Sequence, residues 1–123
     1  MTVEAYIPKY EFITTSFNSA NIDMDLSEAK VLDLYGNAGT LLNDPANDVE
    51  EENYVCVDCD FEAIEQGKED FPEASFRFWD RHNQMVHPNG QIDLPIPLEE
   101  GEKFDLIFCF MKTANVDPEI LFA

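Results

Sequence analysis

The sequence predicts a single α/β domain built on a mostly parallel β-sheet. Short apolar runs recur along the chain, as expected of strands that are buried on both faces. A segment with helix start and stop signals lies between two of these runs. The 123 residues, 45% of them hydrophobic, suffice for one domain with its own core. Strands that alternate with helical or connecting segments favour a parallel sheet with right-handed crossovers.

The first strand is expected at residues 30–35, KVLDLY, an apolar run that ends in a glycine turn. Residues 1–29 show no clean period, so we expect an N-terminal arm of irregular or short elements that covers one face of the sheet. After the turn, Asp44 and Pro45 suit the N-cap and first position of a helix, several residues downstream of Gly39.

The second strand and the helix after it are expected at residues 53–60, NYVCVDCD, and 60–72. Asp60 suits the N-cap, Glu62 falls in the first turn and Pro72 lies just beyond the end. One helical face should lie on the sheet. It carries Phe61, Ile64 and Phe71.

The third and fourth strands are expected at residues 74–80, ASFRFWD, and 103–110, KFDLIFCF. Residues 81–102 between them contain a Pro-Asn-Gly turn and an LPIP stretch, which exclude a regular helix throughout. A loop of this length is expected to be functional or to cover part of the sheet.

The charge balance excludes several function classes. With 26 acidic and 7 basic side chains, the formal net charge is -19, which repels phosphate backbones and anionic membrane surfaces. The strongest apolar run, residues 106–111, is too short to span a bilayer, and no basic region precedes an apolar stretch at the N-terminus. An odd number of cysteines, three, indicates reduced thiols. We expect a soluble, cytoplasmic protein that binds neither nucleic acid nor membranes directly.

Three features converge at the carboxyl ends of the predicted strands. In a doubly wound sheet, ligands bind there, where the strand order reverses. The glycine turn follows the first strand, Asp58 ends the second and Asp80 ends the third. A glycine turn admits a ligand close to the backbone, one carboxylate can hold ribose hydroxyls and another can accept from an adenine amino group.

These residues resemble a known family. VLDLYGNAG, then YVCVDCDFEAIEQGKEDFPEASFRFWD, then KFDLIFCF are similar in order and spacing to the cofactor-binding half of the Rossmann-like (class I) S-adenosylmethionine-dependent methyltransferases, over residues 30–110. The resemblance implies a Rossmann-like sheet, truncated after the fourth strand, and S-adenosylmethionine as cofactor. Residues 111–123 would form a C-terminal segment.

The resemblance also implies a role for each cofactor-binding residue. Residues 34–39 would face the methionine part, Asp58 would bind the ribose and Cys59 would lie against the adenine ring. Asp80 and the backbone of Arg81 would meet the adenine edge, with Phe110 beneath the cofactor. The implied site consists of Leu34, Tyr35, Gly36, Asn37, Gly39, Asp58, Cys59, Asp80, Arg81 and Phe110.

The glycine turn departs from the family pattern. Members read D-x-G-x-G-x-G or D-x-x-x-G-x-G after the first strand, whereas Tyr35, Asn37 and Ala38 interrupt that series and only Gly36 and Gly39 remain. Asn tolerates a left-handed backbone better than other non-glycine residues, so Asn37 can keep the shape of the turn. Its side chain would crowd the ligand.

The chain also ends about a dozen residues after the fourth strand, whereas the family's sheet continues. The fourth strand would then be an exposed edge that pairs readily with another chain. We expect two copies to join through this edge and residues 104–123, burying Leu121 and Phe122, or a partner chain to take that place.

Other cofactor sites are also compatible with parts of the pattern. A nicotinamide site shares the strand, the turn and the acidic residue, although the glycine pattern fits it no better. A Walker-type phosphate loop is excluded because no Gly-Lys-Ser/Thr follows. Cys56, Cys59, His82 and His87 form a zinc-like series, but strand residues three apart point to opposite faces, so we expect no metal site.

Two functional hypotheses from different classes follow. The first is an S-adenosylmethionine-dependent methyltransferase, completed by oligomerisation, that acts on a small molecule or a protein. FMKTAN lacks the [DN]-P-P-[YF] pattern by which relatives hold a base amine, and among His82, His87 and Lys112 no catalytic base can be named. The second is a catalytically silent methyltransferase-like binding module whose acidic surface suits a basic partner.

Overall fold

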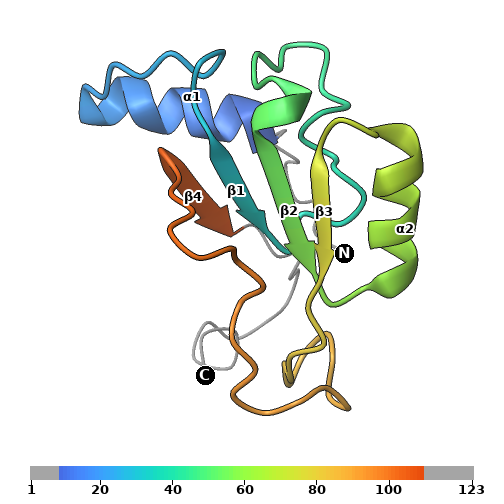
Figure 1. The fold of residues 1–123 in the computed structure, drawn as a ribbon. Coiled ribbons are helices and arrows are strands. Elements are labelled where there is room, and N and C mark those ends of the chain that lie inside the picture. Colours follow the sequence, from blue (N-terminus) through green and yellow to red (C-terminus); the bar gives the residue numbers. More distant parts are fainter. Residues whose placement is uncertain (1–8, 110–123) are drawn as a thin grey trace, which may run out of the picture.

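The computed structural model describes residues 9–109 and contains one four-stranded parallel sheet (Figure 1). Its strands are β1 (Val31–Leu34), β2 (Tyr54–Asp58), β3 (Ser75–Phe78) and β4 (Leu106–Cys109), in the order β3-β2-β1-β4. All carboxyl ends point to the same edge of the sheet, and the order reverses at β1 (Figure 1). The α/β, Rossmann-like fold class is confirmed.

Helices cover one face of the sheet. α1 (Lys9–Ala20) and α2 (Phe61–Asp70) lie on this side, with an apolar core between them and the strands (Figure 1). We call it the helix-covered face. Its buried residues include Tyr10, Ile13, Val31, Leu41, Val49, Tyr54, Cys56, Ile64 and Phe76.

The predicted start of α2 is confirmed. Asp60 is the N-cap, and its carboxylate accepts a hydrogen bond from the amide of Ala63 at 3.1 Å. Ile64 is fully buried, as its helical face predicted. The prediction that Phe61 lies against the sheet is wrong, because 54% of its surface is exposed. Phe61 is the first residue of α2, just beyond the carboxyl end of β2. Its ring packs edge-on against that of Phe78, with the centroids 5.4 Å apart.

The N-terminal arm was expected in residues 1–29 as irregular or short elements that cover one face. Its described part contains the 12-residue helix α1 (Lys9–Ala20), which does cover one face of the sheet. Tyr10, Ile13 and Phe17 contact the core at helical spacing, three and four residues apart. The Thr, Ser and Asn residues between them have modest helix propensity and obscure this pattern. Burial against the sheet, rather than propensity, stabilises such a helix.

The helix expected at Asp44 and Pro45 is also wrong. This region forms turns, followed by the short 3₁₀ helix η1 (Glu51–Asn53). The Asp44 carboxylate accepts from the amide of Ala46 at 2.9 Å, and the side-chain oxygen of Asn47 accepts from the amide of Val49 at 3.0 Å. Such local bonds compete with helix formation.

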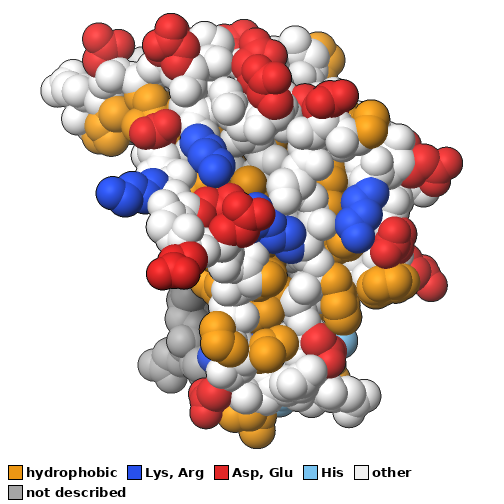
Figure 2. Space-filling view, viewed as in Figure 1, with side chains coloured by type: hydrophobic (Ala, Val, Ile, Leu, Met, Phe, Trp, Pro, Cys, Tyr) orange, Lys and Arg blue, Asp and Glu red, His pale blue; other side chains and the backbone are white. Residues whose placement is uncertain are grey.

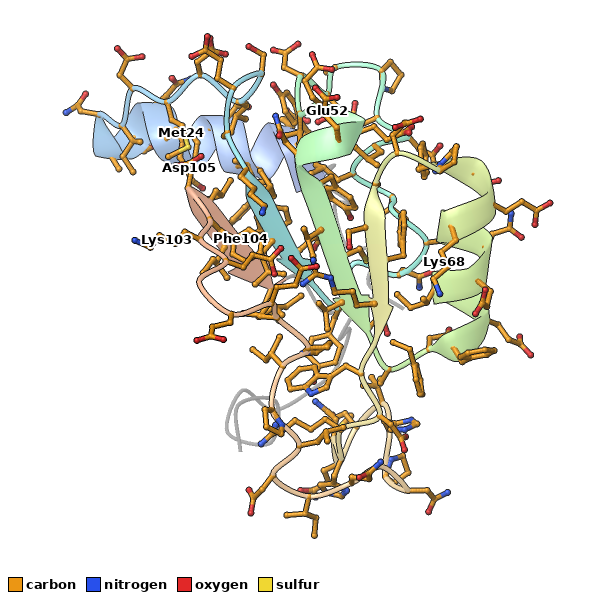
Figure 3. The ribbon with its side chains drawn as sticks, in the orientation of Figure 1. Met24, Glu52, Lys68, Lys103, Phe104 and Asp105 are labelled. Atoms are coloured by element: carbon orange, nitrogen blue, oxygen red, sulfur yellow. The ribbon has the colours of Figure 1, made fainter. Side chains whose placement is uncertain are left out.

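A long loop covers the opposite face, which we call the loop-covered face. Leu32, Val55, Val57 and Trp79 form a second core there, and Leu94, Ile96 and Phe104 of the loop pack on it. The Trp79 indole donates to the carbonyl of Leu94 at 3.0 Å. Figure 3 shows Phe104 over this face while its neighbour Lys103 points away from it. The expected absence of a regular helix in residues 81–102 is confirmed.

The surface reflects the composition. Figure 2 shows acidic side chains spread over the view and hydrophobic side chains in several patches, many of them in its lower half. Within residues 9–109, no helix has the length and apolar character needed to cross a membrane. Phe110 and the segment with Leu121 and Phe122 lie outside the described residues.

Candidate functional site

The turn after β1 contains three left-handed residues at alternate positions. The backbone φ is 59° at Tyr35, 58° at Asn37 and 82° at Gly39. With Asp33 at the start, these are the three glycine positions of a D-x-G-x-G-x-G series. The turn therefore places left-handed residues at these three positions, and two of the three are not glycine. A left-handed conformation costs a non-glycine residue about 1 kcal/mol or more.

Gly36 is required for a different reason, which is close approach of the turn to the sheet. A Cβ atom at this position would lie 2.6 Å from a carboxylate oxygen of Asp33 and 2.6 Å from the Cys56 sulfur. Asp33 is fully buried and accepts a hydrogen bond from the Tyr54 hydroxyl. Burial, followed by the charge of Asp33, raises the pKa of Tyr54 well above its ordinary value.

Asp58, at the end of β2, holds this turn in place. Its Oδ2 accepts from the amide of Asn37 at 2.7 Å, and its Oδ1 accepts from the amide of Asp60 at 2.9 Å. Only 6% of the residue is exposed. The Cys56 thiol donates to the Asn37 carbonyl at 3.4 Å, so β2 fastens Asn37 on both sides. Each carboxylate oxygen of Asp58 still has lone-pair capacity for a ligand.

A pocket of about 510 Å³ opens beside the turn. This volume is within the range of small-molecule sites, about 300–1,000 Å³. It lies at the carboxyl ends of β1, β2 and β3, where ligands of such sheets bind. Its described lining consists of Tyr35, Asn37, Asp58, Cys59, Asp60, Phe61, Glu62, Phe78, Val86 and His87.

Aromatic rings supply the apolar part of the pocket. Phe61 meets Phe78 edge-on, and the His87 ring packs edge-on against Phe78 with centroids 6.5 Å apart. Phe78 is 37% exposed, so it presents apolar surface to the pocket. The Tyr35 ring lies 6.0 Å from that of Trp79, which positions it at the pocket edge.

The thiol in the pocket is not activated. Burial, together with the neighbouring Asp58 charge, raises the pKa of Cys59 to about 11. A thiol with this pKa stays protonated at neutral pH and is a poor nucleophile. Cys59 therefore contributes shape to the pocket rather than covalent chemistry.

Asp80 organises the long loop instead of lining the pocket. Its Oδ1 lies 2.6 Å from Nε2 of His87, and its Oδ2 accepts from the side-chain Nε2 of Gln91 at 3.2 Å. These hydrogen bonds, His87 first, lower the pKa of Asp80. The Arg81 guanidinium lies over the Trp79 ring, 5.5 Å from its centroid. The contact with Asp80 thus holds the His87 ring at the pocket wall.

The structure brings together four of the ten residues implied by the sequence: Tyr35, Asn37, Asp58 and Cys59. The others are outside the described lining. Leu34 packs in the core of the loop-covered face, Gly36 and Gly39 shape the turn, and Asp80 and Arg81 belong to the loop. Phe110 lies outside the described residues.

Several lining residues were not identified from the sequence. Asp60 and Phe61 directly follow the second strand and Phe78 ends the third, so their position at strand ends was an available signal. Val86 had no such signal, and His87 was considered only as a candidate base and in the zinc-like series. They reach the pocket because residues 83 and 87 form a small antiparallel bridge that folds the loop back.

The cysteines and histidines of the zinc-like series are engaged separately. Cys56 donates to Asn37, His82 contacts the Pro88 carbonyl, and His87 contacts Asp80. Within residues 9–109, no three His, Cys, Asp or Glu side chains gather as a metal site requires. No protein-family model, curated protein or solved structure matches the chain.

Proposed function

We propose that the chain is a methyltransferase-like protein that binds S-adenosylmethionine in the pocket beside the β1 turn. The observation that carries this proposal is the alternation of left-handed residues at Tyr35, Asn37 and Gly39, next to an acidic residue that ends β2. Glycine adopts the left-handed conformation readily, so this alternation, at the edge of the sheet where ligands bind, is compatible with a glycine-rich cofactor turn.

The pocket suits the adenosine part of the cofactor. Asp58 has lone pairs left to accept the ribose hydroxyls, beside the two amides that it already binds. The rings of Phe61 and Phe78 offer apolar surface to the adenine. Val86 completes this apolar wall from the long loop.

Methyl transfer from a sulfonium is an in-line displacement, so alignment of donor and acceptor supplies most of the catalysis. The acceptor that we propose is a small molecule or a protein, because the charge of -19 disfavours nucleic acid. His87 is the imidazole in the described lining, and its Nε2 contacts Asp80, so we assign it no catalytic role.

Calorimetric titration with S-adenosylmethionine and S-adenosylhomocysteine tests this proposal. We expect micromolar binding by the wild-type chain and a loss of tenfold or more in Asp58→Ala. Because Asp58 also holds the turn, Phe61→Ser serves as a second variant. Its ring is largely exposed, so it should weaken binding without lowering the unfolding temperature.

Glu69→Ala is the matched control, since it removes an exposed carboxylate of α2 outside the described pocket lining. It should leave the affinity unchanged. Absence of binding to the wild-type chain would overturn the proposal.

The alternative function is a catalytically silent binding module. The observation that favours it is the bond from the Asn37 amide to Asp58, which occupies a donor of the turn, together with Tyr35 at a glycine position. The acidic surface would then bind a basic partner. The absence of cofactor binding, with retained affinity for basic proteins, distinguishes this function from the first.

We also propose that β4 joins another chain, as a second copy or a different partner. Within residues 9–109, β4 ends the sheet and pairs with β1 on one side. Edge strands readily add a strand from another chain. Analytical ultracentrifugation at micromolar concentration tests this assembly, and a monomer would contradict the homo-oligomer.

We propose a cytoplasmic location because the number of cysteines indicates reduced thiols. The chain contains three cysteines, an odd number without the spacing of a disulfide framework. Reduced cysteines are typical of compartments in which thiols are kept reduced. Alkylation of all three in freshly lysed cells, without prior reduction, would support this location, and a disulfide-linked species would contradict it.

A further inference from the structure

We infer that the pocket selects its adenosyl ligand by charge, favouring a cationic group and rejecting a carboxylate. The preferred ligand class is an adenosyl sulfonium or amine without a carboxylate. This inference rests on the proposed function, because it concerns the same pocket. Three independent features of the pocket carry it: its charges, its occupied backbone donors and its aromatic rings.

The charged groups of the described pocket lining are acidic. Asp58, Asp60 and Glu62 line the pocket, whereas no Lys or Arg is among the described lining residues. Other cations are engaged elsewhere: Lys30 and Arg77 pair with Glu102, Lys68 pairs with Glu65, and Arg81 lies over Trp79. Carboxylates that converge in a concave site produce a negative potential, which attracts cations and repels anions.

Three backbone donors of the turn beside the pocket are already occupied by the protein itself. In the turn, the amide of Asn37 donates to Asp58, that of Ala38 to the Asn37 side chain at 2.9 Å and that of Gly39 to the Gly36 carbonyl at 3.1 Å. A ligand carboxylate that entered here would lose its water without gaining these donors. Such an uncompensated charge is costly.

The N-terminus of α2 is unfavourable to anions because it carries carboxylates of its own. A helix N-terminus attracts anions through its free amides and its dipole. Here the Asp60 carboxylate caps the Ala63 amide, and Glu62 adds a second negative charge in the first turn. The positive end of the helix is therefore neutralised by the protein's own carboxylates.

Aromatic faces add attraction for a cation. Tyr35, Phe61 and Phe78 all line the pocket. Sulfonium and ammonium groups are attracted by the negative face of an aromatic ring. A carboxylate gains nothing from these rings, so the aromatic and acidic groups favour the same ligands.

Four ligands separate the effect of the ligand carboxylate from that of the sulfonium charge. S-Adenosylmethionine and its decarboxylated form differ only in the carboxylate, and their two demethylated thioethers lack the sulfonium charge. We expect decarboxylated S-adenosylmethionine to bind about tenfold more tightly than S-adenosylmethionine, and each sulfonium more tightly than its thioether. Calorimetry at low and high ionic strength should show that both preferences shrink as salt screens the charges.

Two variants that each remove one negative charge test whether the acidic residues of the pocket cause the preference for the decarboxylated ligand. Glu62→Gln removes a charge of the lining, and Asp60→Asn does so while keeping a good N-cap residue. Each should reduce the preference for the decarboxylated ligand severalfold. Glu69→Gln, on the same helix but outside the described lining, removes the same charge and should leave the preference unchanged.

The outcomes separate the two claims. If the adenosyl ligands bind but S-adenosylmethionine binds as tightly as its decarboxylated form, the charge selection is overturned and the cofactor proposal stands. If Glu69→Gln changes the preference as much as Glu62→Gln, overall charge rather than the pocket acids is responsible, and the inference fails. If none of the four ligands binds, the proposed function fails, and this inference with it.

Discussion

The two faces of the sheet are covered in different ways. On the helix-covered face, α1 and α2 pack apolar side chains such as Ile13 and Ile64 against the strands. On the loop-covered face, a chain segment without regular helix packs Leu94, Ile96 and Phe104 on Trp79 and its neighbours. Helices satisfy most of their own backbone hydrogen bonds, whereas a loop needs other partners from the backbone, side chains or water. The second face therefore depends on specific polar contacts.

Glu102 supplies several of these contacts. Its carboxylate binds Arg77 of β3 through two hydrogen bonds of 2.6 and 2.8 Å and pairs with Lys30 at 3.3 Å. Arg77 also donates to the Pro97 carbonyl at 2.9 Å. The Glu102 side chain is only 5% exposed. This cluster clamps the end of the long loop across the sheet, a function that apolar packing performs on the other face.

Gly67→Ala should have the largest effect on stability, because it disturbs the packing of the helix-covered face. A Cβ atom at this position of α2 would overlap the buried ring of Phe76. We expect unfolding free energy to fall by about 2 kcal/mol, because overpacking outweighs the gain in helix propensity. Urea denaturation measures this change. Combining it with Phe76→Leu should recover part of the loss, and strictly additive effects would contradict the contact.

Glu102→Gln should break the loop-covered face at a smaller cost of about 1.5 kcal/mol at neutral pH. Hydrogen bonds from Arg77 lower the pKa of Glu102 from 4.5 to about 2. Because the folded pKa is lowered, this stabilisation is fully present above about pH 4.5 and is lost as the pH falls toward 2. The stability difference between wild type and variant should shrink over that window. A difference independent of pH would contradict the ionic clamp.

Two variants of Asn37, Asn37→Ala and Asn37→Gly, test the left-handed backbone of the turn. Asp58 and Cys56 of β2 both bond to the backbone of this residue. Since φ is 58°, Asn37→Ala should be about 1 kcal/mol less stable than Asn37→Gly. Chemical denaturation of the two variants gives the difference directly. Equal stabilities would show that the turn relaxes out of the left-handed conformation.

Ile107→Thr should have the smallest effect. Ile107 of β4 is 59% exposed on the loop-covered side, whereas its neighbour Phe108 packs against the other core. Both Ile and Thr suit a strand, so we expect a change below about 0.5 kcal/mol in the isolated chain. A larger loss that grows with protein concentration would indicate that another chain covers this residue.

The sequence was sufficient for the elements with strong local signals. The four strands follow from apolar runs, and α2 follows from Asp60 as its N-cap, because these signals act within a few residues. α1 was missed because its apolar stripe is separated by Thr, Ser and Asn. The helix expected at Asp44 was wrong because Asp44 and Asn47 bond to nearby amides instead.

The candidate site was predicted only in part for a related reason. Asp58 and the turn at residues 35–39 are adjacent to strand ends, so their position could be inferred. The expected adenine-edge residue Asp80 instead contacts His87, seven residues away, and brings that ring to the pocket. A local pattern does not reveal how a 22-residue loop folds back on a sheet.

The sequence by itself determined the parallel α/β class, the capped helix α2 and the acidic character of the chain, since these depend on local spacing and composition. The tertiary structure decided three further matters: the helix α1, the clamp at Glu102 and the anchoring of the Asn37 amide by Asp58. Each depends on contacts between residues far apart in the chain, which only the packed sheet brings together.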